Sequence, residues 1–373
     1  MKYYIIAGEA SGDLHGSNLM KGLLAQDSNA DIRFWGGGCM EAVGGTMVRD
    51  YRDTAVMGIS EVLGKIGSII GNLKFCKKDI LDFKPDVVIL IDYPGFNMKI
   101  SRFCHHHGIR NFYYIAPKTW ASRSWRNRAI KRYTDKLFIV FPFEKPWFEA
   151  AGIPYVYCGN PLLDSVSDFR YTRVTPHPYI AILPGSRSGE ISRMMPVCME
   201  TVDRLKSLPQ YRNYEFHIAG APSRTKEDYL KYIGDRKDVF LEFDRTYDIL
   251  KFAEAAIVNS GTASLEAALM STAQVVCWST SGLTYFVGKY ILRVLKHIKY
   301  ISLANLIADK LIFKEFIQSD FNADNVTAET RRLIEDFSYR ADMMSDYVKV
   351  RNLLGCSGAS KQVAAAIIKE LNQ

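Results

Sequence analysis

The sequence predicts an α/β protein made of two doubly wound, Rossmann-like domains that face each other across a cleft. The chain has 373 residues, which is long for one hydrophobic core. Short apolar runs alternate with helical periodicity, and several runs are apolar throughout, as in strands that a parallel sheet buries on both faces. The runs form two series, and the polar segment 164–178, with two prolines, separates them.

The two series of strands define the expected domains. The first series comprises Tyr3–Ala7, Ile32–Trp35, Val87–Ile91, Asn111–Ile115 and Lys136–Phe141. The second comprises Tyr179–Leu183, Glu215–Ala219, Val239–Phe243, Ala255–Val258 and Val275–Trp278. We therefore predict domains over 1–165 and 166–340. The remaining segment, 341–373, is expected to be helical and to cross back to the first domain.

Composition excludes several classes of protein. Hydrophobic residues make up 48% and charged residues 24%, which argues against disordered, collagen-like and coiled-coil chains. The net charge of +8 favours anionic partners. Seven cysteines without C-x-x-C spacing fit free thiols in a reducing cytosol. The N-terminal apolar run is too short for a signal peptide, and the uncharged stretch Ala267–Gly288 is too rich in Ser and Thr for a membrane span.

Two loops of the second series suggest a nucleotide diphosphate site, because ligands bind beyond the carboxyl ends of parallel strands. Gly185, Ser186 and Arg187 link a strand to a helix, where backbone N–H groups and a guanidinium suit phosphate. The alternative is a plain turn with a surface arginine. The second loop can bind phosphate through its hydroxyls and ribose through its carboxylate, or can simply be a capped helix start. Its candidate residues are Ser260, Gly261, Thr262 and Glu266.

In the first series, Asp92 ends a buried strand and is a candidate base for a sugar hydroxyl. The alternative is an Asx-turn or a helix cap, which is the commoner role of Asp before Pro. The segment Gly8–Gly16 contains glycines that let a substrate approach the backbone, but it lacks G-x-G-x-x-G spacing. A nicotinamide is therefore not expected, and we predict no cofactor.

We predict no metal site. The chain contains no Asp-x-Asp pair, which sugar-nucleotide transferases that hold a divalent metal usually need. The run His105–His107 has no acid or cysteine at ligand spacing, so it is interpreted as a solvated helix end.

Three segments suggest contact with lipid or anions. An apolar stripe with lysines at its edges and a basic helix over 285–300 are typical of helices on anionic membranes, or of ordinary core-facing helices. The residues concerned are Val62, Leu63, Ile66, Ile69, Ile70, Leu73, Arg293 and Lys296. A basic-aromatic cluster that includes Trp120 and Arg123 can bind a phosphorylated acceptor or nucleic acid, although no nucleic-acid-binding module accompanies it.

Six segments, in this order, resemble the lipid-A-disaccharide synthase family of Gram-negative bacteria, whose members are glycosyltransferases of the GT-B fold. The resemblance runs from about Tyr3 to Gln318. The segments are Gly8–Asp13, Ile91–Asn97, Ala116–Ala121, Leu183–Arg187, Ser260–Glu266 and Ser302–Asn305. The chain departs from the family pattern at Ser122, Asn160 and Ala304, where Trp, His and Pro are usual.

The resemblance implies a reaction and a set of site residues. A 2,3-diacylglucosaminyl group would pass, with inversion and without metal, from its UDP derivative to the 6-hydroxyl of 2,3-diacylglucosamine 1-phosphate. Asp92 becomes the general base and Glu9 a second essential acid; Arg187, Glu266 and Asn305 become donor residues. The expected acceptor residues are Ser11, Gly12, Asp13, Asn97, Trp120 and Arg123.

The resemblance also implies peripheral attachment to the cytoplasmic face of the inner membrane, and we expect no nucleic-acid partner. Two enzyme alternatives remain open, a UDP-N-acetylglucosamine 2-epimerase and a peptidoglycan-precursor transferase, both related by fold. A basic nucleic-acid-binding protein is the alternative from another class.

Overall fold

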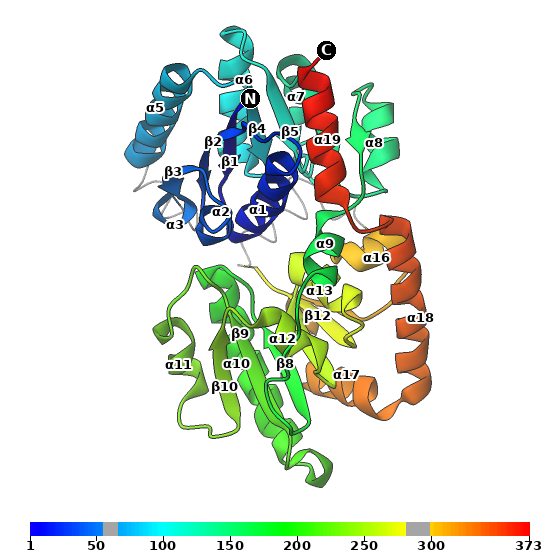
Figure 1. The fold of residues 1–373 in the computed structure, drawn as a ribbon. Coiled ribbons are helices and arrows are strands. Elements are labelled where there is room, and N and C mark those ends of the chain that lie inside the picture. The colour runs from blue at the N-terminus through cyan, green and yellow to red at the C-terminus, as the bar shows by residue number, and fades with distance from the viewer. Residues whose placement is uncertain (55–65, 281–298) are drawn as a thin grey trace. The chain divides into compact units, whose positions relative to one another are not determined.

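The computed structural model describes residues 1–54, 66–280 and 299–373, which form two units (Figure 1). Unit 1 comprises Met1–Ser167 and Leu354–Gln373, and unit 2 comprises Asp168–Leu353. The chain passes from unit 1 to unit 2 after Ser167, close to the predicted domain boundary at 165/166. The chain returns to unit 1 at Leu354, the end of helix α18 (Phe337–Leu354). The predicted boundary at 340/341 falls inside this helix, which continues unbroken through it.

Unit 1 contains a parallel sheet of seven strands in the order β3-β2-β1-β4-β5-β6-β7. Their bounds are β1 Lys2–Ala7, β2 Asp31–Gly36, β3 Thr46–Asp50, β4 Val87–Ile91, β5 Asn111–Tyr114, β6 Lys136–Ile139 and β7 Val156–Tyr157. The helices are α1 Ala10–Leu24, α2 Gly38–Glu41, α3 Tyr51–Thr54, α5 Ile66–Phe83, α6 Pro94–His106, α7 Arg126–Tyr133, α8 Glu144–Ala150, α9 Pro161–Ser167 and α19 Ala359–Leu371.

Unit 2 contains a parallel sheet of six strands in the order β10-β9-β8-β11-β12-β13. Their bounds are β8 Tyr179–Leu183, β9 Glu215–Gly220, β10 Val239–Phe243, β11 Ala255–Asn259, β12 Gln274–Trp278 and β13 Glu315–Ile317. The helices are α10 Ser188–Lys206, α11 Glu227–Ile233, α12 Thr246–Lys251, α13 Thr262–Leu269, α16 Leu303–Ala308, α17 Ala323–Glu335 and α18, with short 3₁₀ turns at Pro209–Tyr211 and Gln318–Asp320.

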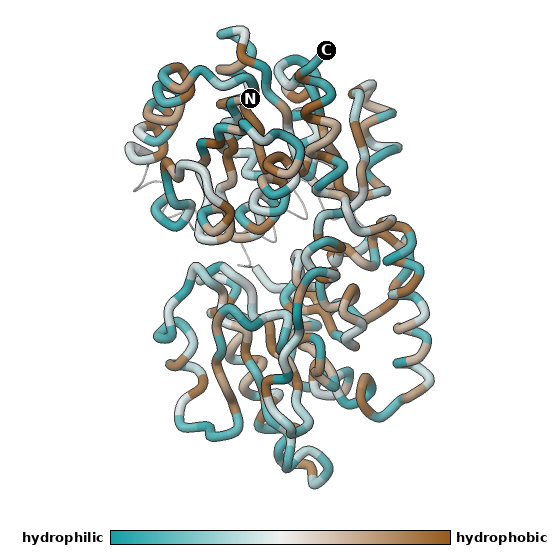
Figure 2. Tube along the Cα trace, viewed as in Figure 1, coloured by the Kyte–Doolittle hydropathy of each residue, from teal (hydrophilic) through white to brown (hydrophobic). Residues whose placement is uncertain are grey.

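The two parallel sheets confirm the predicted fold class of two doubly wound α/β domains. The central strands β4, β8 and β11 are buried along their whole length, and Figure 2 shows hydrophobic residues gathered along the strands. Their continuous apolar sequences arise because helices cover both faces of each sheet. The edge strands β3, β7 and β13 were not predicted, since they are short and only half-buried.

The C-terminal helix α19 belongs to unit 1 and packs against α1. The contact is close, because a Cβ placed on Gly22 would lie 3.0 Å from the Cβ of Ala364. Asp164 in α9 fixes the start of α19. Its carboxylate accepts backbone N–H groups from Gly358, Ala359 and Ser360 at 2.5, 3.2 and 2.8 Å, which satisfies donors that a helix start leaves without partners.

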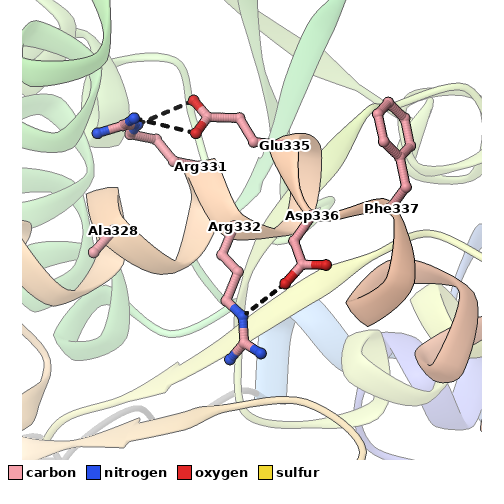
Figure 3. Close-up of a pocket in the computed structure, with 6 residues that line it drawn as sticks. All are labelled: Ala328, Arg331, Arg332, Glu335, Asp336 and Phe337. Carbon is pink, nitrogen blue, oxygen red and sulfur yellow. Dashed lines mark hydrogen bonds and ion pairs between the residues drawn. The ribbon is translucent and has the colours of Figure 1, made fainter.

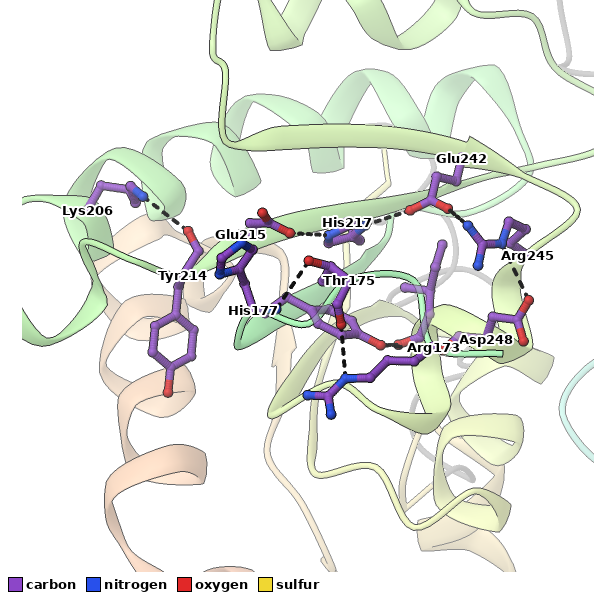
Figure 4. A network of polar contacts seen from close by, with 12 residues as sticks. Arg173, Thr175, His177, Lys206, Tyr214, Glu215, His217, Glu242, Arg245 and Asp248 are labelled. Atoms are coloured by element: carbon purple, nitrogen blue, oxygen red, sulfur yellow. Dashed lines mark hydrogen bonds and ion pairs between the residues drawn. The ribbon is translucent and has the colours of Figure 1, made fainter. Parts of the chain in front are cut away.

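Of the predicted linker 164–178, residues 168–178 belong to unit 2 and lie against it (Figure 4). The backbone N–H of Thr172 donates to Asp248 at 2.6 Å. Asp248 belongs to a chain of ion pairs that reaches Glu242 through one arginine. Glu242 in turn lies 2.6 Å from Nδ1 of the buried His217. The linker is thus held to unit 2 by polar contacts.

Candidate functional site

The two acids predicted for catalysis, Glu9 and Asp92, follow adjacent strands at the point where the strand order of the unit 1 sheet reverses. β1 and β4 pair with Ala7 opposite Ile91, and the chain continues from them to opposite sides of the sheet. Glu9 is exposed before α1, and Asp92 is half-buried directly after β4. Both acids therefore lie at the switch point where doubly wound folds bind ligands.

The turn that carries Asp92 is strained. Asp92 and Tyr93 have φ angles of 42° and 46°, a region that costs a residue with a side chain roughly 1–2 kcal/mol. Asn97 Nδ2 donates to the carbonyl oxygens of Ile91 and Asp92 at 3.1 and 2.9 Å, and the Tyr113 hydroxyl donates to the Asp92 carbonyl at 2.7 Å. These bonds hold the backbone of the turn. The residue that directly precedes α6 is Tyr93 and not Asp92.

Glycine is required at position 8 because the ring of Tyr93 occupies the space of a side chain. A Cβ on Gly8 would lie 2.3 Å from that ring. Burial raises the pKa of the Tyr93 phenol, and the charge of Glu9 raises it further. Glu9 therefore lies beside the ring of Tyr93, the residue that follows Asp92 in the chain, so the two acids are neighbours of the same aromatic residue.

The other residues predicted at the start of α1 differ in exposure. Ser11 is half-buried, whereas Gly12 and Asp13 are buried. The Asp13 carboxylate accepts three backbone N–H groups from α2 and the residue before it, at 2.8–3.0 Å. Asn97 is fully buried and makes the bonds described above. Asp13 and Asn97 thus position the backbone, and their side chains are turned inward.

Trp120 and Arg123 lie in the loop after β5. The half-buried Trp120 ring meets Phe143 edge-on, with centroids 4.9 Å apart. Arg123 is exposed and has a φ of 57°. Ser122, one of the departures from the family pattern, is also exposed. A second departure, Asn160, is buried and donates to the Val140 carbonyl at 3.0 Å.

Glu144, next to this loop, is a buried acid whose burial was not predicted from the sequence. It is 1% exposed, and its carboxylate accepts the N–H groups of Val140 and Phe141 at 3.2 and 3.0 Å. Burial raises its pKa to about 7, although these bonds and the neighbouring Trp120 favour the charged form. In the sequence it looks like an ordinary acid at a helix start.

In unit 2, the loops after β8 and β11 lie side by side at the switch point of the sheet. Gly185 has a φ of 99°, and a Cβ there would lie 2.5 Å from Glu190 Oε2 and 2.6 Å from Asn259 Nδ2. Arg187 is exposed, and its Nη1 lies 3.6 Å from Glu190 Oε1. The N–H groups of Ser186 and Arg187, which the sequence analysis gave to phosphate, donate instead to Glu190 Oε2 at 3.1 and 3.2 Å.

The loop after β11 presents Ser260, Gly261 and Thr262 at the start of α13. The Ser260 hydroxyl donates to the carbonyl of Ile301 at 3.1 Å. A side chain on Gly261 would meet no atom within 4 Å, so space beside this backbone is open. Thr262 is half-buried.

Glu266 lies one turn further along α13. The Tyr247 hydroxyl donates to its carboxylate at 2.9 Å, and burial raises its pKa.

Asn305 supports the Ser260 loop from behind. It is fully buried, and its Nδ2 donates to Glu315 Oε1 at 2.8 Å. Glu315 also accepts the N–H groups of Ile301 and Ser302 at 2.8 and 3.0 Å. Asn305 and Ile301 therefore donate to the same carboxylate, and the carbonyl of Ile301 accepts the Ser260 hydroxyl. Asn305 is expected to be a donor-site residue, and in the structure its side chain is turned inward. Ala304, the third departure from the family pattern, is fully buried.

Two cations near the unit 2 loops were not predicted. Arg224, after β9, donates from Nε to the Ser186 carbonyl at 3.0 Å. Arg193, on α10, donates from Nε to the Ser279 carbonyl at 2.9 Å. Their sequence positions carry no motif, and only the sheet order brings them to the same edge.

Of the residues predicted to contact lipid, those in α5 can be placed. Ile70 is 48% exposed, and Ile69 and Leu73 are half-buried; Phe75, which was not among the predicted residues, is 42% exposed. Outside the described residues or side chains lie Val62, Leu63, Ile66, Arg293 and Lys296. No helix in the described ranges is both long and apolar enough to cross a bilayer.

Two other features of the described residues offer fewer groups for a ligand than these loops do. A shallow pocket where α17 meets α18 is lined by two arginines already paired with Glu335 and Asp336 (Figure 3). The three histidines at 105–107 are exposed at the end of α6. No cluster of three metal-ligating side chains was found within residues 1–54, 66–280 and 299–373.

The two doubly wound units, with candidate loops at both switch points, place the chain among the proteins of the GT-B fold, in which sugar-nucleotide transferases and epimerases both occur. Solved structures share this fold. A UDP-GlcNAc 2-epimerase from Neisseria meningitidis, bound to UDP-GlcNAc, matches with a TM-score of 0.71 and 13% identity over 99% of this chain and 100% of that one. The S. aureus MnaA–UDP co-structure matches with a TM-score of 0.72 and 15% identity over 100% and 97%. At these identities the likeness shows the fold alone.

Sequence comparison identifies the family. Residues 3–368 match the lipid-A-disaccharide synthetase family. The lipid-A-disaccharide synthase of Geobacter sulfurreducens is 36% identical over 99% of this chain and 97% of its own length. That of Syntrophus aciditrophicus is 35% identical over 96% and 95%. The chain belongs to the lipid-A-disaccharide synthase family, as the six sequence segments predicted.

Proposed function

We propose that this protein transfers 2,3-diacylglucosamine from its UDP derivative to the 6-hydroxyl of 2,3-diacylglucosamine 1-phosphate, with inversion and release of UDP. Family membership supports the reaction. One observation carries the assignment of residues: in each unit, the candidate loops follow the two strands at which the sheet order reverses. Carboxylates stand at the switch point of unit 1, and Arg187 with hydroxyl groups stands at that of unit 2.

Asp92 acts as the general base in this proposal. Its carboxylate takes the proton of the acceptor 6-hydroxyl as that oxygen bonds to the anomeric carbon of the donor. The bond from this carbon to the diphosphate oxygen breaks, and UDP leaves with the electron pair. Attack opposite the leaving group inverts the anomeric carbon. The rigid turn around Asp92 favours this role, since a fixed base needs little reorganisation during the reaction. Glu9, beside Tyr93, serves as the second acid.

The donor binds to unit 2 through complementary groups. Arg187 neutralises the diphosphate as negative charge develops on it, Ser260 and Thr262 offer hydroxyls, and Glu266 accepts the ribose hydroxyls. Phosphate can use the N–H groups of Ser186 and Arg187 only after Glu190 releases them. The proposed reaction uses no metal, in keeping with the missing Asp-x-Asp pair, and no cofactor.

Both substrates carry acyl chains, so we propose that the protein works on the cytoplasmic face of the inner membrane as a peripheral protein. Ile70 and Phe75 of α5 project from unit 1, and Lys74 and Lys78 are exposed on the same helix. Apolar side chains beside lysines suit an anionic lipid surface. We propose no nucleic-acid partner.

The test is an assay with radiolabelled UDP-2,3-diacylglucosamine, 2,3-diacylglucosamine 1-phosphate and a chelator. Disaccharide and UDP should form at equal rates, and UDP-N-acetylglucosamine should not be epimerised. Asp92→Asn should lower turnover by about 10²- to 10⁴-fold while UDP affinity, measured by calorimetry, stays unchanged. Epimerisation without disaccharide would refute the proposal, and full turnover by Asp92→Asn would remove this residue from the mechanism.

A further inference from the structure

Arg123, in the loop after β5, and Arg126, the first residue of α7, lie close together, and neither pairs with an acid among the described residues. Arg123 and Arg126 are three residues apart and share a turn, in which the N–H of Arg126 donates to the Arg123 carbonyl at 2.9 Å. Neither forms an ion pair with any carboxylate in the part of the chain that the structure describes. The guanidinium of Arg126 lies instead 5.7 Å from the centroid of the Trp125 ring.

This arrangement is electrostatically incomplete. Arg126 is half-buried. Burial lowers the pKa of its guanidinium, and the charge of Arg123 lowers it further. A cation that is partly removed from water beside a like charge is unfavourable unless an anion joins it. Neighbouring acids usually fill such a place, so their absence from the described residues around Arg126 points to an anionic ligand.

Tyr113 interacts with both Arg126 and the turn that carries Asp92. Its hydroxyl donates to the Asp92 carbonyl at 2.7 Å. Burial raises the pKa of this phenol, the Asp92 charge raises it further, and the Arg126 charge opposes both. Asp92 and Arg126 therefore act on the same phenol. Both belong to unit 1: Asp92 directly follows β4, and Arg126 begins α7, the helix after the neighbouring strand β5.

We infer that Arg126, assisted by Arg123, binds the phosphate group of the acceptor and makes this enzyme selective for a phosphorylated sugar. The inference rests on the proposed function, which supplies a sugar with a phosphate on C1 and the attacking hydroxyl on C6. The planar guanidinium fork matches two phosphate oxygens. With the phosphate held there, the opposite end of the sugar ring is directed to the Asp92 turn.

The experiment compares two acceptors, 2,3-diacylglucosamine 1-phosphate and the same sugar without phosphate, in wild-type enzyme and Arg126→Ala. The variant should lose about 10- to 100-fold in kcat/KM for the phosphorylated acceptor, the effect of one charge-assisted contact. Its kcat/KM for the unphosphorylated acceptor and its KM for the donor should stay unchanged. Arg126→Lys, which keeps the charge but not the fork, should give an intermediate loss.

Arg102→Ala is the matched control, because Arg102 is an exposed arginine on α6 of the same unit. It should leave both acceptors unaffected. An equal loss on both acceptors in Arg126→Ala would instead assign Arg126 to positioning the Asp92 turn, and no loss would remove it from the site. Either result overturns the inference. If circular dichroism shows that Arg126→Ala does not fold, Arg126→Lys and Arg123→Ala replace it. The same ratio, kcat/KM for the phosphorylated acceptor over kcat/KM for the unphosphorylated one, then decides.

Failure of the proposed function would show separately, as no disaccharide from wild-type enzyme with either acceptor. Binding of glucosamine 1-phosphate, measured by calorimetry, then tests the anion site without turnover. Binding to the wild type that is lost in Arg126→Ala supports the site. No binding to the wild type overturns it.

Discussion

Replacing Glu144 by glutamine removes a titrating group from the interior of unit 1, and the structure gives the size of the expected effect. The folded protein raises the pKa of this carboxyl from 4.5 to about 7. At about 1.4 kcal/mol for each pH unit, this shift corresponds to roughly 3 kcal/mol. The glutamine side chain would stay neutral at every pH, and its amide oxygen can still accept an N–H from the backbone.

The sign follows from proton binding. The folded state binds this proton more tightly than the unfolded state, so the contribution of Glu144 to stability is fully present below pH 4.5. It is lost as the pH rises through about 7 and is constant above that. We therefore expect Glu144→Gln to unfold like the wild type near pH 4.5 and to be more stable by up to about 3 kcal/mol at about pH 8.

Urea unfolding at several pH values between about 5 and 8, followed by tryptophan fluorescence, measures this difference. Four of the five tryptophans, at 35, 120, 125 and 147, belong to unit 1, so the signal reports mainly on that unit. Glu149→Gln is the control, because Glu149 is exposed on the same helix. Parallel pH profiles for wild type and Glu144→Gln would refute the reasoning.

Three further substitutions test separate contacts. Gly8→Ala should destabilise unit 1 by about 1–3 kcal/mol through the clash with Tyr93, whereas Gly95→Ala, where a Cβ meets no atom within 4 Å, should not; thermal unfolding compares them, and equal melting points would contradict the clash. Arg187→Ala should weaken UDP binding about 10- to 100-fold in calorimetry, and unchanged affinity would exclude a donor contact. Asp164→Ala should cost about 1–3 kcal/mol by uncapping α19 and speed proteolysis of the C-terminus; an unaltered digestion rate would count against this.

Much of the fold could be predicted because it depends on local sequence. The apolar runs that predicted β4 and β8 are buried from end to end in the structure. The short strand β13 could not be found in this way, since its half-buried residues carry no alternation or apolar run. Its position depends on pairing with β12, a contact between segments far apart in the sequence.

The candidate site was predictable where a residue type alone indicates chemistry. Asp92 after an apolar strand is such a case. Side-chain partners were not predictable, because they depend on tertiary contacts: Glu190 occupies the N–H groups of its own loop, and Asn305 turns inward to Glu315. Glu144 was missed for the same reason, since only the folded chain shows that this acid is buried.

The position of α19 has a consequence for biogenesis. Unit 1 is discontinuous in sequence: its last helix is synthesised only after all of unit 2 has been translated. The surface of α1 around Gly22 therefore stays uncovered until the last residues of the chain are made. A stop codon before residue 359 would thus damage the portion of the polypeptide that was made first.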